Sequence, residues 1–427
     1  MRKRFIAFGG VALAALAAVP AAAAPLPRPP LVSLNVSGSH YGLTEKTDPY
    51  QTPPAADYTS VGINGALSGD DRTPMVGQKD PKCADWIDAL PQPTMPTSEA
   101  YCWDTEMQGK QGKENAHLMP WVPQGIATSG EAQLSGIPIG GNNRTAVVSW
   151  TWQNTKQDPV TDPNNPPPVK KDYRHNSVKL AFVNLDDMKY RFVLPVWIDE
   201  AGVQRRIYGH GGGLAWYGPY LFMASTANWE GKPGPDAGKA GVRVFDTRKI
   251  YKKKDGSGGD YQYVLPEVRH YVSGGTSFDY VSLDRNSAGG ASLVGGNYKN
   301  SGDLNTYAGT EVYRYRFGDD YRLNPTPVQG WKSTVPQDAA DAISDVQGVQ
   351  ANGDTLYFNM SKGKLANRRF ATAGVGGAAS DWTIKSRKDS SYRPQDLSLW
   401  YATNELWSLT EGEEDRVLYS VKLDALK

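Results

Sequence analysis

The 427-residue sequence has only two cysteines, five histidines and almost no excess charge, since 46 basic residues stand against 45 acidic ones. A net charge of +1 leaves no electrostatic footprint for nucleic acid or an anionic membrane surface. The sequence has one long apolar run, at its N-terminus, which excludes a protein with several membrane spans. These absences favour a globular protein without a highly charged polymer as its partner.

Glycine, proline and aromatic residues are abundant instead, with 45 Gly, 30 Pro and 11% Phe, Trp and Tyr. So much Gly and Pro excludes a coiled coil or a helical bundle, because both residues weaken helix interiors. The aromatic content excludes a disordered chain. The composition therefore predicts an all-β globular protein.

The first 24 residues have the pattern of a secretory signal peptide. Basic residues at positions 2–4 precede an apolar stretch from Phe5 to Val19, which is followed by Pro20 and four alanines. A membrane anchor is the alternative, although the apolar stretch is short for a span. We expect cleavage after Ala23 or Ala24, a secreted protein, and no membrane association after cleavage.

The two cysteines, Cys83 and Cys102, predict one disulfide in an exported chain. Closing a loop of this size would stabilise the fold by about 3 kcal/mol. A zinc site is the alternative, but two cysteines without nearby histidines do not complete a tetrahedron.

The mature chain is expected to have two parts. Residues 25–115 form a Pro- and Gly-rich N-terminal arm, pinned by the disulfide, in which Leu31–Val36 is the clearest strand. Residues 116–427 carry recurring short apolar strands separated by turn residues.

Five segments share one pattern, in which a turn leads into an apolar strand, a polar or Gly-rich turn and a second strand. The first strands are centred near Ile126, Leu214, Val281, Val349 and Leu397. The hairpin is clearest where Val349–Ala351 turns through Asn352-Gly353-Asp354 into Thr355–Phe358, because Asn-Gly between apolar strands favours a tight hairpin.

A third strand follows in most copies, for example Gly241–Asp246, and a fourth in some, for example Tyr190–Leu194. Four antiparallel strands per unit, repeated five times, predict a five-bladed β-propeller. The last unit stops after its third strand, so we expect Leu31–Val36 to complete it and close the ring. A β-sandwich would explain the strands but not the repeated hairpin.

The repeats resemble a group of secreted, uncharacterised actinobacterial-type β-propeller proteins. The resemblance covers residues 117–427 and rests on segments such as His210–Leu214, Asp345–Val349 and Leu406–Glu411. It implies the propeller architecture and no particular activity.

In a propeller, the loops before the first strands and after the second strands meet at one face, around a central funnel. Acidic and histidine side chains at these positions are candidate catalytic groups, because paired carboxylates act as acid and base in glycoside hydrolysis and a histidine can act as a base. They are His210, Asp279, Asp345, Asp396 and Glu411. Alternatively, the acids and glutamines of this region bind backbone groups and hold the blades in register.

Candidate substrate-binding residues at the same face are Gln124, Gln347 and Gln395, together with Trp229, whose ring could stack on a sugar. The loop Asp255–Asp260 resembles part of a calcium loop but lacks the distal glutamate, so a plain hairpin loop is favoured and any structural Ca²⁺ stays open. The metal content is not predicted.

Two hypotheses for function remain. The first is a secreted hydrolase or lyase acting on an extracellular polymer, most simply a glycan, with its site in the funnel. The second is a non-catalytic propeller that binds glycans or proteins. The funnel positions differ from blade to blade, which favours one asymmetric site over a repeated lectin motif. We expect a monomer whose partner is an extracellular polymer or a small molecule.

Overall fold

A computed structural model describes residues 31–48, 50–77, 97–104, 107, 121–152, 177–199, 201–226, 240–257, 261–298, 309–333, 343–361, 369–376, 383–412 and 416–426. Within these ranges the chain is all-β, with two short α-helices, α1 (Gly62–Leu67) and α3 (Ser129–Ala132), and two 3-10 turns, η1 (Ser39–Tyr41) and η5 (Leu423–Leu426). The all-β prediction is confirmed.

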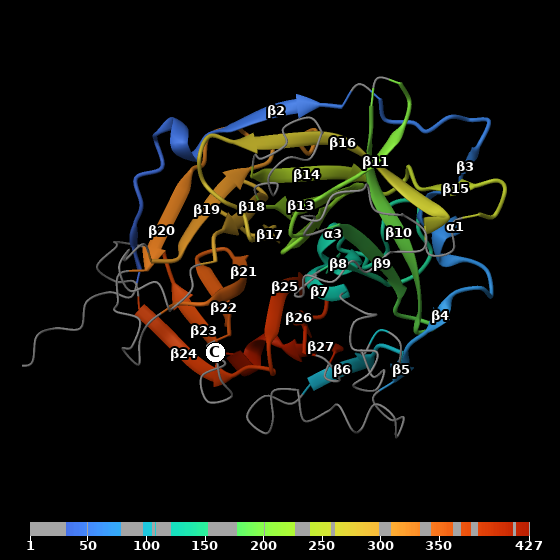
Figure 1. Ribbon diagram of the computed structural model, residues 1–427. Helices are drawn as coiled ribbons and strands as arrows, with labels where there is room; N and C mark the ends of the chain where they lie inside the picture. Colours follow the sequence, from blue (N-terminus) through green and yellow to red (C-terminus); the bar gives the residue numbers. More distant parts are fainter. Residues whose placement is uncertain are drawn as a thin grey trace, which may run out of the picture.

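The C-terminal part consists of successive antiparallel runs, each with its first strand innermost (Figure 1). The first run is β7 (Trp121–Thr128), β8 (Thr145–Trp152), β9 (Val178–Asn184) and β10 (Lys189–Ile198). The second is β12 (Leu214–Tyr217), β13 (Tyr220–Ser225), β14 (Gly241–Asp246) and β16 (Tyr263–Ser273). A short parallel pairing of β10 with β16 joins these two runs into one 13-stranded sheet.

Three further runs form separate sheets. They are β17 (Tyr280–Asp284), β18 (Ser292–Gly296), β19 (Glu311–Arg316) and β20 (Gln329–Ser333); then β21 (Val346–Asn352), β22 (Thr355–Met360), β23 (Arg369–Gly374) and β24 (Thr383–Asp389); and last β25 (Pro394–Trp400), β26 (Glu405–Thr410) and β27 (Val417–Lys422). The hairpins predicted at 214–223, 349–358 and 397–409 are confirmed.

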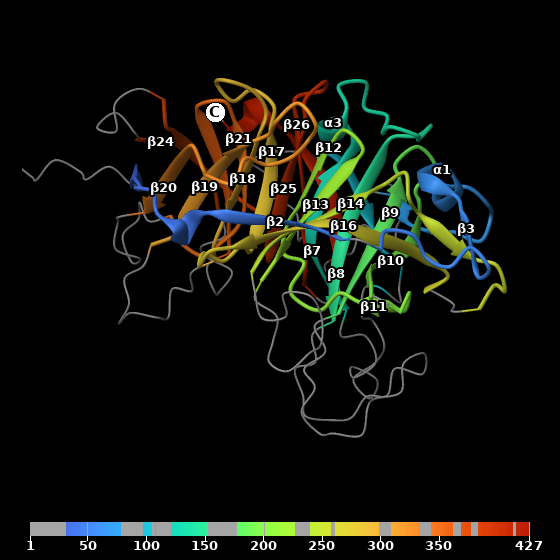
Figure 2. The ribbon, with the colours of Figure 1, turned by 90° about the horizontal axis from the view of Figure 1, so that it is seen from above.

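The first strands of the five runs form a closed ring. Strand β7 contacts β12, β12 contacts β17, β17 contacts β21, β21 contacts β25, and β25 returns to β7. Figure 2 shows these strands side by side, with α3 at one end of the molecule. Residues far apart in the sequence therefore meet at either end of one central axis.

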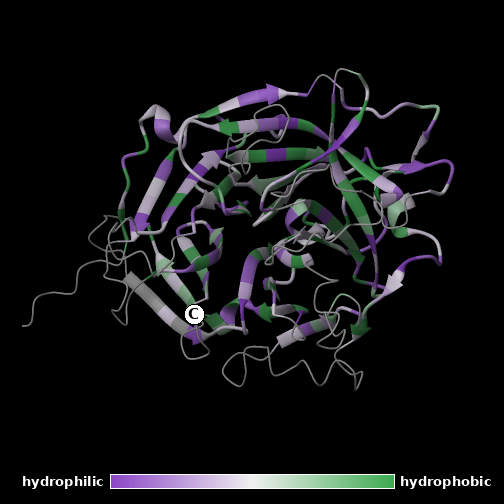
Figure 3. Ribbon diagram, viewed as in Figure 1, coloured by the Kyte–Doolittle hydropathy of each residue, from purple (hydrophilic) through white to green (hydrophobic). Residues whose placement is uncertain are grey.

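The N-terminal residues supply strands to the outer edges of several sheets. They are β1 (Leu31–Ser33), β2 (Leu43–Thr47), β3 (Tyr58–Ser60), β4 (Thr73–Pro74), β5 (Val76–Gly77) and β6 (Thr97–Cys102), and two short strands, β11 (Gln204–Arg206) and β15 (Tyr251–Lys253), also lie on the periphery. Strand β2 is largely hydrophilic, as expected for an outer edge (Figure 3).

The last sheet takes its fourth strand from β6, which pairs antiparallel with β27. The expectation that Leu31–Val36 completes this sheet is wrong. Leu31–Ser33 does form a strand, but it pairs with β20 at the edge of the third run. The sequence of a strand specifies that its backbone is extended and which face is buried. It specifies less strongly which other strand it pairs with.

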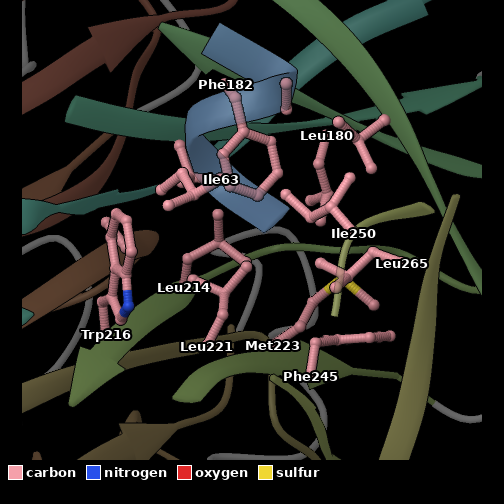
Figure 4. Close-up of a cluster of buried hydrophobic side chains, with 14 of the residues drawn as sticks. Ile63, Leu180, Phe182, Leu214, Trp216, Leu221, Met223, Phe245, Ile250 and Leu265 are labelled. Atoms are coloured by element: carbon pink, nitrogen blue, oxygen red, sulfur yellow. The ribbon is translucent and has the colours of Figure 1, made fainter. Parts of the chain in front are cut away.

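The hydrophobic core lies between neighbouring runs rather than in one central mass. The cluster between the first and second runs contains Phe182, Leu214, Trp216, Met223 and Phe245, all at most 1% exposed, and α1 covers it from outside with Ile63 (Figure 4). Comparable clusters fill the spaces between the other neighbouring runs. Both faces of the inner strands are therefore buried, which leaves their ends as the accessible part of the axis.

Candidate active site

The candidate site lies where the first strands begin and the second strands end. Backbone hydrogen bonds join these points, from Ser361 N to the Asp345 carbonyl oxygen (2.9 Å) and from Glu411 N to the Arg393 carbonyl oxygen (3.1 Å). We call this end the mouth. Gln124, Gln347 and Arg393 border it, and its central residues are His210, Asp279, Tyr298, Asp345 and Glu411. All of the central residues except Asp345 are partly exposed.

Tyr298, which follows β18, is the point on which three carboxyl groups converge. Its hydroxyl donates to Asp345 Oδ1 (3.4 Å), and its backbone N–H donates to Asp279 Oδ2 (2.7 Å). Burial, followed by the negative charges of Asp345, Glu411 and Asp279, raises the pKa of Tyr298 to about 12. Asp345 and Asp279 therefore contact Tyr298 directly, and the charge of Glu411 also acts on its phenol.

Glu411 has the environment of a carboxylic acid that holds its proton. Burial raises the pKa of Glu411 above its ordinary value, and a hydrogen bond from Gln124 Nε2 to Oε2 (2.9 Å) and the charges of Arg393 and Arg416 oppose that shift. The net direction is upward. Glu411 therefore stays protonated to a higher pH than a solvated glutamate does, as a general acid requires.

His210 lies four residues before β12, close to the backbone carbonyl of Asp279. A Cβ added to Gly212 would lie 2.0 Å from the Asp279 carbonyl oxygen and 3.4 Å from His210 Nδ1, so only glycine fits between them. Burial lowers the pKa of His210 to about 4. The imidazole is therefore neutral at neutral pH, where it can accept a proton or donate a hydrogen bond.

Two residues at the mouth have strained backbones. Asp345 (φ 51°) and Arg393 (φ 45°) adopt left-handed conformations at equivalent positions before β21 and β25. Such conformations are unfavourable for residues other than glycine and recur at functional sites. They fix the direction in which both side chains leave the chain.

Asp396 lies deeper in the axis, away from the mouth. Its side chain is fully buried, and Oδ2 accepts hydrogen bonds from the backbone N–H groups of Ile126 (3.0 Å) and Leu214 (2.9 Å). Burial also raises the pKa of Asp396 well above its ordinary range. These contacts fit the alternative in which an acid holds the runs in register, so we exclude Asp396 from the proposed catalytic set.

The predicted substrate-binding glutamines differ in their surroundings. Gln124 is buried against Glu411, and Gln347 is partly exposed and donates to Ser361 Oγ (2.7 Å). Gln395 is buried, and its backbone carbonyl oxygen accepts a hydrogen bond from Asn359 Nδ2 (2.7 Å). Gln124 and Gln347 therefore belong to the mouth, whereas Gln395 belongs to the packed interior.

Several predictions fall wholly or partly outside the described residues. Trp229 and Cys83 lie there, as does the signal-like segment, so the disulfide to the buried Cys102 stays a prediction. In the calcium-like loop, the Asp255 carboxylate accepts from the backbone and hydroxyl of Ser257 (2.9 and 2.8 Å), as in a plain turn.

Among the residues that the structure describes, no group of three or more His, Cys, Asp and Glu side chains is arranged to hold a metal ion. The same residues include no helix long and apolar enough to cross a membrane.

Tyr298 and Arg393 are the residues of the mouth that the sequence did not single out. Both stand at the strand ends that the repeat places at this face. A tyrosine after an apolar strand resembles any packing aromatic, and an arginine before one resembles any solvated residue, so their position was the one available signal.

No protein-family model and no curated protein matches the chain. Among solved structures, it is similar to a GH43_1 enzyme from Xanthomonas citri, at 10% identity over 70% of this chain and 86% of that one (TM-score 0.38). It is also similar to Pseudomonas fluorescens PhoX in complex with vanadate, at 8% identity over 90% of this chain and 98% of that one (TM-score 0.35).

A third similar structure is the β-1,2-mannobiose phosphorylase from Listeria innocua, at 7% identity over 72% of this chain and 92% of that one (TM-score 0.37). At these scores the likenesses assign no activity, and the function proposed below is argued from the mouth itself.

Proposed function

We propose that the chain is a secreted five-bladed β-propeller that hydrolyses an extracellular glycan at its mouth. Five antiparallel runs whose first strands form a closed ring support the five-bladed architecture. The signal-like residues 1–24 support secretion.

The observation that carries the enzymatic proposal is that Asp345 accepts a hydrogen bond from Tyr298 while the charge of Glu411 acts on the same phenol. Two carboxyl groups on either side of a glycosidic bond suffice for its hydrolysis. Glu411, whose pKa is raised by burial, donates its proton to the leaving-group oxygen. Asp345 takes the second role, either as the base that deprotonates the attacking water or as the nucleophile.

The other residues of the mouth orient these two groups. Tyr298 holds Asp345, and Gln124 holds Glu411 from the neighbouring run. His210 and Asp279 line the remaining side, where they can hydrogen-bond sugar hydroxyls. The groups differ from run to run, so they form one asymmetric site.

The proposal is tested by incubating the purified protein with a panel of neutral and acidic polysaccharides and measuring released reducing ends. Once a substrate is found, Glu411→Gln and Asp345→Asn should each lower kcat by about 10³-fold. Glu405→Gln is the matched control, because Glu405 begins the strand that leads to Glu411 and lies at its opposite end. Activity should survive this change.

A polysaccharide that binds the protein but is never cleaved would contradict the enzymatic proposal and support a non-catalytic glycan-binding protein. Unchanged kcat in both acid variants would also contradict it.

A further inference from the structure

The residue that precedes each first strand at the mouth differs in charge from run to run. Four residues before the centres of the five first strands stand Val122, His210, Ser277, Asp345 and Arg393. Arg393 is the one permanent cation of this set, because an arginine side chain stays protonated at every physiological pH. The fifth run therefore brings a fixed positive charge to the mouth.

Arg393 is a direct neighbour of Glu411, the proposed acid. Its carbonyl oxygen accepts the backbone hydrogen bond from Glu411 N (3.1 Å), and its positive charge lowers the pKa of Glu411. Asp345 holds the equivalent position in the fourth run, whose first strand, β21, contacts β25. Arg393 therefore lies at the side of the mouth where the proposed acid would meet a substrate.

The guanidinium of Arg393 is available to a solute. Arg393 is exposed, and its guanidinium carbon lies 5.4 Å from the centre of the Tyr392 ring. Among the described residues, no carboxylate forms an ion pair with this guanidinium and no oxygen accepts a hydrogen bond from it. The exposed Arg322, by contrast, pairs with Glu45 and Asp320. Arg393 can therefore bind an anion without first giving up an ion pair.

The backbone of Arg393 adopts a conformation that arginine disfavours. Its φ is 45°, in the left-handed region that glycine, asparagine and aspartate tolerate best. The following Pro394 adds a second conflict, since proline restricts the residue before it to extended conformations. An exposed side chain recovers little of this cost by packing. Stability alone would favour glycine or asparagine at this position, so the arginine is explained best by what its guanidinium binds.

We propose that Arg393 binds a carboxylate or sulfate group on a sugar next to the scissile bond, so that the substrate is a glycan with isolated acidic sugars on a neutral chain. This inference rests on the proposed hydrolysis, because it names the substrate class of the same site. A guanidinium forms paired hydrogen bonds with two oxygens of such a group. Asp279 and Asp345 on other runs would repel further negative charges, and the net charge of +1 likewise disfavours a polyanion.

The test compares matched pairs of glycans that differ only in the acidic group. Glucuronoxylan and a glucuronate-bearing arabinogalactan carry isolated uronates on neutral chains, and each is paired with its carboxyl-reduced form. A sparsely sulfated galactan and its desulfated form distinguish sulfate from carboxylate as the group bound. Titration calorimetry in the Glu411→Gln variant measures binding without cleavage. At least one acidic glycan should bind about 10-fold more tightly than its neutral form, as expected for hydrogen bonds between charged groups.

Arg393→Asn, made in the same Glu411→Gln protein, should abolish this preference and leave the binding of the neutral forms unchanged. Asparagine tolerates the left-handed backbone, so the variant should be at least as stable as its parent in thermal unfolding.

Arg322→Asn is the matched control, because it removes an equal charge from an exposed arginine. Arg322 lies at the opposite end of the molecule, where its neighbour Tyr321 packs edge-on against Tyr217, the last residue of β12. This variant should keep the preference for the acidic glycan.

A preference that survives Arg393→Asn would overturn the proposal, as would the absence of any difference between acidic and neutral forms across the panel. Tighter binding of polygalacturonate, which is acidic at every sugar, than of the glycans with isolated uronates would refute the requirement for a neutral chain.

Binding is measured without turnover, so failure of this inference is distinguishable from failure of the proposed hydrolysis. A protein that shows the Arg393-dependent preference but cleaves no glycan would refute hydrolysis and retain the anion-binding role. Cleavage of neutral glycans with no preference for acidic ones would do the reverse.

Discussion

The mouth and the buried axis are built from the same residue types and differ in what their carboxyl groups contact. In the axis, Asp396 accepts from two backbone N–H groups and Glu131 from a third. At the mouth, Glu411 and Asp345 interact with side chains, those of Gln124 and Tyr298. Asp396 and Glu131 are buried and held by backbone groups of the inner strands, whereas Glu411 is partly exposed and can reach a substrate.

The largest effect is expected where the inner strands approach most closely. A Cβ at Gly213 would lie 2.4 Å from the Val281 amide nitrogen and 2.6 Å from the Tyr280 Cα, both backbone atoms of the next run. Gly213→Ala should therefore lower the free energy of unfolding by about 3 kcal/mol in chemical denaturation.

The matched control is Gly38→Ala at the periphery, where an added Cβ meets nothing within 4 Å and φ is −80°. Its stability should stay within about 0.5 kcal/mol of the wild type. Equal effects of the two substitutions would mean that the axis is no more tightly packed than the rim.

A smaller effect is expected in the pH profile of the proposed hydrolysis. Gln124 donates to Glu411 and thereby lowers its pKa, so Gln124→Leu should raise the pKa of Glu411 further. An acid catalyst is active while protonated, and the limb on which kcat/KM falls with rising pH should move to higher pH. Gln347→Leu is the control, since Gln347 donates to Ser361 and not to a carboxylate.

A shift of the limb in the Gln347 variant, or none in the Gln124 variant, would show that Glu411 is not the group that limits activity at high pH.

The smallest effect concerns His210 and the stability of the fold in acid. Its pKa is about 4 in the folded protein and near 6.5 when unfolded, so between these values the unfolded chain binds a proton that the folded chain does not. Stability should fall as the pH drops from 6.5 to 4. His210→Asn should remove about 1–2 kcal/mol of this loss, measured as the change in unfolding free energy between pH 7 and pH 4.5.

Identical acid dependence of the wild type and the His210→Asn variant would show that His210 is not the buried neutral group described here.

The sequence predicted the hairpins well because their signals are local. Asn352-Gly353 lies between apolar strands, and the structure has its turn there, with Gly353 at φ 61°. The meeting of Asp279 and Asp345 at Tyr298 is consistent with the repeat, in which equivalent positions of each run lie at one end.

Which strands pair with each other, and how deeply a side chain is buried, were not predictable in the same way. Leu31–Ser33 and Thr97–Cys102 are both strands, and nothing in either sequence states which of them pairs with β27. Asp396 occupies a position like those of the mouth residues. Its burial depends on the bulge after Pro394 and on the approach of two other runs, which are properties of the assembled ring.

The pairing of β6 with β27 sets an order on folding. Val417 lies opposite Cys102, so the last sheet unites residues more than three hundred positions apart. The ring therefore cannot close until nearly the whole chain has been made, and the early strand must wait with an unpaired edge. Once closed, the junction clamps β27 between β26 and β6, so that the last strand cannot leave its sheet without breaking its pairing with residues 97–102.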